Sequence, residues 1–175
     1  MKKGMRLSWI TIGWGAYIVL SAAFMNQVSL WLASTVGDSF LEGSFWALSI
    51  LILIAAVAYT YKAHISILRA GAVICVFILM YLLSAWQQYF ADKTHILSYG
   101  LLGYLASRDL AASGTMTKVR DLAAVMAFVI FISACDEIFQ WLLPYRTGEM
   151  KDLMTDIVSG ALGACLFMIT RKSRA

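Results

Sequence analysis

The sequence predicts an all-α, polytopic membrane protein, and two observations lead to this fold class. Hydrophobic residues make up 61% of the 175-residue chain and charged residues only 14%, whereas about a quarter of the residues in a soluble domain are charged. The apolar residues also form long runs, such as the uncharged residues 7–37, which are long enough to cross about 30 Å of hydrocarbon as a helix. The length indicates a single integral membrane domain, residues 1–175.

Six transmembrane segments are expected from the distribution of apolar residues. The first run is too long for the core of a secretory signal peptide, so we interpret it as a retained helix, with cleavage after Ser21-Ala22-Ala23 as the alternative. The fourth segment is short and begins with polar residues, which predicts a shortened helix or a re-entrant segment. The expected segments lie near residues 8–32, 45–61, 67–86, 95–107, 122–140 and 153–170.

The basic residues predict the orientation of the chain. Eleven of the fourteen Lys and Arg residues lie before the first segment, after the last, and in the loops that follow the second and fourth, which is the pattern of an even number of spans with positively charged loops inside. Both termini are therefore predicted to be cytoplasmic in a multi-pass membrane protein. Because these residues are dispersed among segment ends, they do not indicate nucleic-acid binding. They are Lys2, Lys3, Arg6, Lys62, Arg69, Arg108, Lys118, Arg120, Arg171, Lys172 and Arg174.

Three polar clusters interrupt the apolar sequence, and the predicted orientation brings all of them to the extracytoplasmic side. They comprise residues 92–95, residues 136–140 and residues 146–156. A charged side chain at the bilayer centre costs about 2.5–3.5 kcal/mol, so such groups usually gather around a partner or a water-filled cavity. The convergence of three separate segments on one leaflet predicts a single outward-facing polar site.

The first cluster carries an imidazole. His95 lies one helical turn before Tyr99, and Asp92 and Lys93 precede it. An imidazole can act as a general base, a nucleophile or a metal ligand, and a nearby carboxylate would orient it. A lone histidine at a membrane interface is more often only a hydrogen-bonding group, but the acidic residues of the other clusters favour a functional role for His95.

The second cluster places Asp136, Glu137 and Gln140 at the end of a helix. Acidic residues are disfavoured there by the helix dipole, so a compensating cation is expected, and Arg146 is the nearest in sequence. One alternative is a purely structural ion pair between Arg146 and one of the two acids. The other is a ligand-binding role, in which Arg146 and Lys93 hold an anionic headgroup.

The third cluster contains Asp152 and Asp156, which lie one turn apart at the start of the last segment. Two carboxylates with this spacing can bind a divalent cation or share a proton. The alternative for Asp152 is a helix N-cap at the membrane surface. Neither the identity of a metal nor a cofactor follows from the sequence.

Small residues in two segments suit close helix packing more than a ligand role. Gly100 and Gly103 lie three positions apart in one segment, and Gly160 and Gly163 have the same spacing in another. Such spacing lets helix backbones approach closely in membranes. The chain contains no phosphate-binding glycine loop, no HExxH and no GxSxG motif, which argues against the enzyme classes that depend on them.

Many of these residues form a set of spaced motifs between residues 92 and 163, which we take as a motif-bearing core. They are Asp92-Lys93-Thr94-His95 with Tyr99 and Gly103, Asp136-Glu137-Ile138-Phe139-Gln140, Pro144-Tyr145-Arg146, Asp152 and Gly163. This combination resembles the VanZ-like family, whose founding members are associated with glycopeptide (teicoplanin) resistance. The resemblance implies a helical inner-membrane protein that acts on the cell envelope or in the antibiotic response.

The chain departs from the family pattern at three positions. Its Pro144-Tyr145-Arg146 replaces the common Pro-Gly-Arg, so Tyr145 stands where the family commonly has Gly. It also has Asp156 where Asn is common and Ser159 where Gly is common. The change to Asp156 adds a carboxylate to the predicted site.

The leading functional expectation is a site that binds or processes an anionic envelope lipid or a lipid-linked cell-wall precursor. Its candidate catalytic residues are His95, Glu137 and Asp136, its candidate substrate-binding residues are Lys93, Tyr99, Gln140 and Arg146, and Asp92, Asp152 and Asp156 are supporting residues or metal ligands. The sequence leaves open whether the protein is an enzyme. The alternatives are a proton-coupled transporter or channel component, and a non-catalytic packing subunit of an envelope complex.

Overall fold

The protein is all-helical throughout the residues that the structure, a computed structural model, describes: 7–112, 119–144 and 150–171. This confirms the predicted fold class. The helices are α1 (Trp9–Ser21), α2 (Met25–Val36), α3 (Asp38–Lys62), α4 (Ile67–Ala85), α5 (Phe90–Ala112), α6 (Val119–Leu142) and α7 (Met150–Thr170).

Several helices are long and apolar enough to cross a membrane. Among the described residues, α3, α4, α6 and α7 each meet this requirement alone, and α1 and α2 meet it only as a pair. Their outward surfaces carry large apolar side chains, including Leu51 and Ile54 of α3, Leu82 of α4 and Phe131 of α6. In a membrane such side chains contact lipid rather than water. The protein therefore has the character of a multi-pass helical membrane protein.

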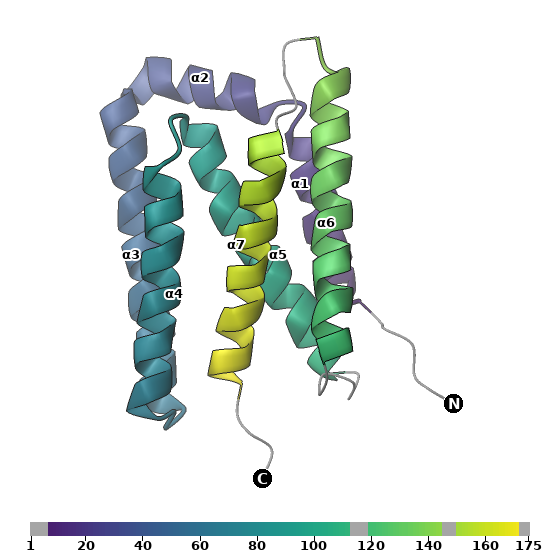
Figure 1. Ribbon diagram of the computed structural model, residues 1–175. Helices are drawn as coiled ribbons and strands as arrows, with labels where there is room; N and C mark the ends of the chain where they lie inside the picture. The colour runs from purple at the N-terminus through teal and green to yellow at the C-terminus, as the bar shows by residue number, and fades with distance from the viewer. Residues whose placement is uncertain (1–6, 113–118, 145–149, 172–175) are drawn as a thin grey trace.

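The first expected segment, residues 8–32, is not one continuous helix. It is broken after Ser21, and α1 and α2 meet at 70°. We call the upper end of the bundle the end at which α6 finishes and α5 and α7 begin, which is at the top of Figure 1. α2 lies across this upper end and buries none of its residues. Gly37, with φ +86°, turns the chain from α2 into α3.

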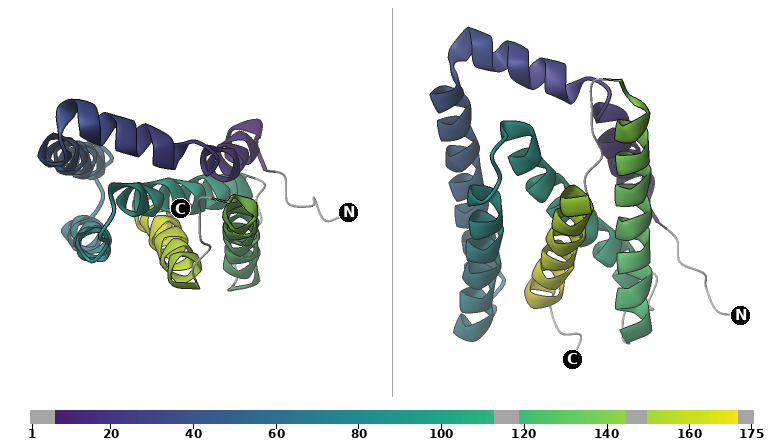
Figure 2. Two further views of the ribbon diagram at one scale, coloured as in Figure 1. Left: turned by 90° about the horizontal axis from the view of Figure 1, so that it is seen from above. Right: turned by 45° about the horizontal axis from the view of Figure 1, so that its top comes forward.

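α5 lies at the centre of the bundle (Figure 2). It is 23 residues long, longer than the short segment expected at residues 95–107. The sequence concealed its length because charged residues flank the apolar part at both ends, and they also keep α5 out of the set of helices that qualify as spans alone. α5 contacts α1, α6 and α7, so its polar side chains are covered by neighbouring helices.

Glycines bring α5 and α7 into backbone contact, in keeping with the close packing that their spacing indicated. The contact between these two helices is the most extensive between any two in the described chain. A Cβ atom on Gly103 would overlap the carbonyl group of Gly160, and one on Gly163 would overlap the carbonyl group of Gly100. This close crossing fixes how His95 of α5 and Asp156 of α7 lie relative to each other, because each is within two turns of it.

A polar contact at the lower end attaches α1 to α5. The Ser8 amide donates a hydrogen bond to Asp109 Oδ2 at 2.7 Å, and Thr11 Oγ1 donates to the same oxygen at 2.6 Å. Arg108 Nη2 contacts Asp109 Oδ1 at 2.9 Å. Ser8 also caps α1, since its Oγ accepts a hydrogen bond from the Thr11 amide at 3.3 Å. α1 therefore begins beside the end of α5.

Candidate functional site

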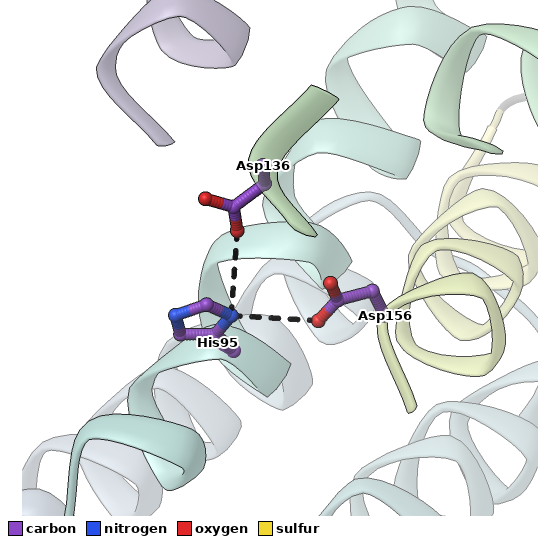
Figure 3. Close-up of side chains that lie close together, drawn as sticks. All are labelled: His95, Asp136 and Asp156. Atoms are coloured by element: carbon purple, nitrogen blue, oxygen red, sulfur yellow. Dashed lines mark ion pairs between the residues drawn. The ribbon is translucent and has the colours of Figure 1, made fainter. Parts of the chain in front are cut away.

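Three side chains from three different helices converge near the upper end of the bundle (Figure 3). His95 is in the second turn of α5, Asp136 is near the end of α6, and Asp156 is in the second turn of α7. His95 Nδ1 lies 3.8 Å from Asp136 Oδ2 and 3.6 Å from Asp156 Oδ1. The sequence assigned these residues to three separate clusters, and tertiary packing brings them together.

The two carboxylates are buried, whereas the histidine reaches the surface. The side chains of Asp136 and Asp156 are 0% and 1% exposed, and that of His95 is 22% exposed. The histidine therefore stands between the buried acids and the outside of the bundle. A ligand would meet the imidazole first.

Hydroxyl groups hold both carboxylates in place. The Tyr99 hydroxyl donates to Asp136 Oδ2 at 3.2 Å, and Ser133 Oγ donates to Asp156 Oδ2 at 2.8 Å. Ser133 and Tyr99 are themselves fully buried. Ser133 was not among the predicted site residues, although its position one turn before Asp136 on α6 could have identified it.

The other acidic and amide candidates surround this centre. Gln140 is buried one turn after Asp136 on α6, and Glu137, next to Asp136, is partly buried. Asp92 and Asp152 are partly exposed in the first turns of α5 and α7. They lie nearer the helix starts than His95 and Asp156, so they belong to the rim of the site and not to its buried centre.

Lys93 does not join His95, Asp136 and Asp156. Its ammonium group forms an ion pair with Glu42 of α3 and lies 5.9 Å from the centroid of the Trp46 ring. The lysine is buried although Glu42 is half-exposed. The sequence offered no sign of this partner, because Glu42 lies 51 residues away in a different segment. Arg146, the other predicted headgroup-binding cation, lies outside the described residues.

An apolar cavity of about 690 Å³ lies on the side of α5 that faces away from His95 and Tyr99. It is bounded by α1, α3, α4, α5 and α7, and Phe90 and Thr94 line it close to the upper end. Toward the lower end its walls include Tyr59 of α3 and Thr170 of α7. The cavity therefore extends along most of the bundle, and its volume is within the usual range of ligand sites, roughly 300–1,000 Å³.

The side chains of the site are suited to two kinds of chemistry, proton transfer and the binding of a cation. An imidazole beside two carboxylates can transfer protons to or from a bound group. The same set of one nitrogen and two oxygen atoms can bind a metal ion.

Comparison with known proteins places the chain in a family. No curated protein and no solved structure matches it. The family model described as VanZ/LLP1 matches residues 12–171, which extends the resemblance well beyond residues 92–163 on which the sequence motifs lie. The match includes His95, Asp136 and Asp156. The chain belongs to the VanZ/LLP1 family of proteins.

Proposed function

We propose that this protein binds, and chemically processes, the headgroup of an anionic envelope lipid or a lipid-linked cell-wall precursor. The upper end of the bundle would face the extracytoplasmic side of the inner membrane, as the distribution of basic residues predicts. The observation that carries the proposal is the convergence of His95, Asp136 and Asp156 at one end of an apolar helical bundle. Buried ionisable groups in a membrane protein are costly and generally functional.

His95 is the proposed acid–base group, because it is the member of the centre that reaches the surface. Asp136 and Asp156 flank its Nδ1 atom and would favour the protonated imidazole when a proton is taken from the substrate. Tyr99 holds the Asp136 side of the centre through its hydrogen bond, and the buried Gln140, one turn after Asp136, would contact the substrate. Arg146 would bind the anionic headgroup through its guanidinium group.

The apolar cavity supports a lipid as the substrate. Phe90 and Thr94 border it in the same turns of α5 that carry the polar centre. Because α5 separates the cavity from His95, a lipid with its hydrocarbon chain in the cavity would have to pass its headgroup over the start of α5, near Phe90 and Thr94, to reach the imidazole. The two features together match an amphipathic molecule better than a water-soluble one.

The depth of the ionisable groups favours this function over transport of protons. A transmembrane proton path needs polar groups through the bilayer centre. The described residues 96–107 of α5, 122–135 of α6 and 157–170 of α7 contain no Asp, Glu, His, Lys or Arg. The centre therefore serves one end of the bundle, and an involvement in the glycopeptide response would follow from its action on a cell-wall precursor.

The proposal is tested with purified protein and labelled envelope lipids, including anionic phospholipids and a polyprenyl-linked precursor. We expect binding that weakens at least tenfold, and product formation that is lost, in His95→Ala. His64→Ala is the matched control, because His64 is exposed in the turn after α3 at the lower end. Glu137→Gln tests whether the partly buried acid beside Asp136 contributes to turnover or only to binding.

Equal binding of every lipid class by the wild type and His95→Ala would refute the proposal. Flux of protons in proteoliposomes that depends on Asp156 would favour the transport alternative. Loss of folding in both His95→Ala and Glu137→Gln, without any lipid effect in the wild type, would favour a packing role.

A further inference from the structure

The centre has the arrangement of a metal site. His95 Nδ1 and one oxygen each of Asp136 and Asp156 lie within 4.8 Å of one another. They come from three helices and face a common point (Figure 3). Sequence spacing had paired Asp152 with Asp156 as metal ligands, whereas the three-dimensional arrangement groups Asp156 with residues of α5 and α6.

The distances between these atoms favour a shared ion over direct hydrogen bonds. The separations of 3.6 and 3.8 Å from His95 Nδ1 to the two carboxylate oxygens exceed the roughly 2.7–3.2 Å of an N–H···O bond. Ligand atoms about 2.0–2.2 Å from a tetrahedral ion lie about 3.3–3.6 Å from each other. Small side-chain adjustments would therefore place an ion between the three atoms.

Both carboxylates also have oxygen atoms that accept no hydrogen bond. Asp136 Oδ1 and Asp156 Oδ1 are buried and lack a hydrogen-bond donor, although buried acceptors are nearly always satisfied. Asp156 Oδ1 is the oxygen that points at His95. A cation between the three side chains would satisfy this oxygen directly.

Charge balance points in the same direction. Within the described part of the chain, no Lys or Arg nitrogen is paired with Asp136 or Asp156, and His95 is the cationic partner of both. A protonated imidazole balances only one of the two carboxylates. A divalent ion with a neutral imidazole balances both, which matters because an uncompensated buried charge is strongly destabilising.

The surroundings are those of a site that orients its ligands. Ser133 donates to Asp156 Oδ2, and Tyr99 donates to Asp136 Oδ2, and such hydrogen bonds typically fix metal-binding carboxylates. Because three protein ligands leave a position open, and His95 is partly exposed, an ion here would be reachable by a ligand from outside.

We propose that His95, Asp136 and Asp156 bind one divalent first-row transition-metal ion, of which Zn²⁺ is the representative probe. One nitrogen and two carboxylate oxygens suit this class of ion. The metal site rests on geometry alone; only its use in holding an anionic headgroup depends on the proposed function. In that role the ion would supply the positive charge in place of a protonated imidazole, so the acid–base role proposed for His95 applies to the metal-free centre.

The test uses the full chain, purified without a polyhistidine tag, treated with chelator and titrated with Zn²⁺. Metal content after desalting is expected to be one ion per chain, with thermal stabilisation that reverses on chelation. His95→Ala, Asp136→Asn and Asp156→Asn should each abolish stoichiometric binding. Ser133→Ala, which removes only a supporting hydrogen bond, should weaken binding about 10–100-fold.

Two variants serve as matched controls. His64→Ala removes an exposed histidine, and Asp109→Asn removes a buried carboxylate at the lower end; both should keep full metal binding. If the three ligand variants do not fold, the His64→Ala protein is titrated with Co²⁺ instead. A tetrahedral nitrogen–oxygen site is expected to give intense visible absorption, which should disappear when Zn²⁺ displaces the Co²⁺. Absence of binding, or binding that survives all three ligand substitutions, would overturn the assignment. Neither result depends on lipid turnover.

Discussion

Replacement of Gly103 by alanine tests the backbone contact on which the site depends. The new Cβ would overlap the carbonyl group of Gly160. Unlike the end of a flexible side chain, a helix backbone cannot rotate away, so α5 and α7 must move apart. Because His95 and Asp156 are on these two helices, the same movement would open the polar centre.

The cost follows from two opposing effects. Extra methyl groups in a well-packed interior cost about 1–3 kcal/mol, and a rigid backbone obstacle places Gly103→Ala near the upper value. Alanine is favoured over glycine within a helix by about 1 kcal/mol. The expected net loss is therefore ~2 kcal/mol, or a fall in Tm of about 4–8 °C for a chain of this size.

Thermal unfolding in detergent measures this loss, and Gly43→Ala provides the matched control. Gly43 is also helical, but a Cβ atom there would have nothing within 4 Å. The control should gain the helix-propensity benefit without any clash. If Gly103→Ala is as stable as Gly43→Ala, then α5 and α7 do not cross in backbone contact, and our account of how the centre is positioned is wrong.

Three further predictions concern buried polar contacts. Tyr99→Phe should lower stability by about 1.5–3 kcal/mol, because it removes a hydrogen bond to a carboxylate, and exposed Tyr61→Phe should have no effect in the same unfolding assay. The single variant Glu42→Gln should lower Tm more than the double variant Glu42→Gln/Lys93→Met, because the single change leaves the buried Lys93 ammonium group without its anion. Equal losses of Tm in the two variants would contradict the ion pair. Asp109→Asn should loosen α1 without affecting Zn²⁺ binding, as measured by faster hydrogen exchange in α1; unchanged exchange would show that other contacts hold α1.

The sequence predicted the helical membrane character of the chain because long apolar runs have few other stable arrangements in lipid. It was less accurate at the ends of helices. Residues 8–32 looked like one segment because they carry no charged side chain, and the 70° break between α1 and α2 lies inside this uncharged run. α5 looked short because hydropathy measures polarity, whereas neighbouring helices cover its polar side chains.

The sequence by itself indicated which polar residues are candidates for a site and in which segments they lie, since charged groups in apolar helices are costly enough to stand out. It also indicated the family and that the segments with paired glycines suit close helix packing, whereas the structure showed that these two helices, α5 and α7, meet each other. Only the tertiary structure decided that Asp156 joins His95 and Asp136, while Lys93 turns to Glu42. The physical reason is that residue spacing along a helix fixes which side chains share a face of that helix, whereas the glycine crossing of α5 and α7 decides which faces meet.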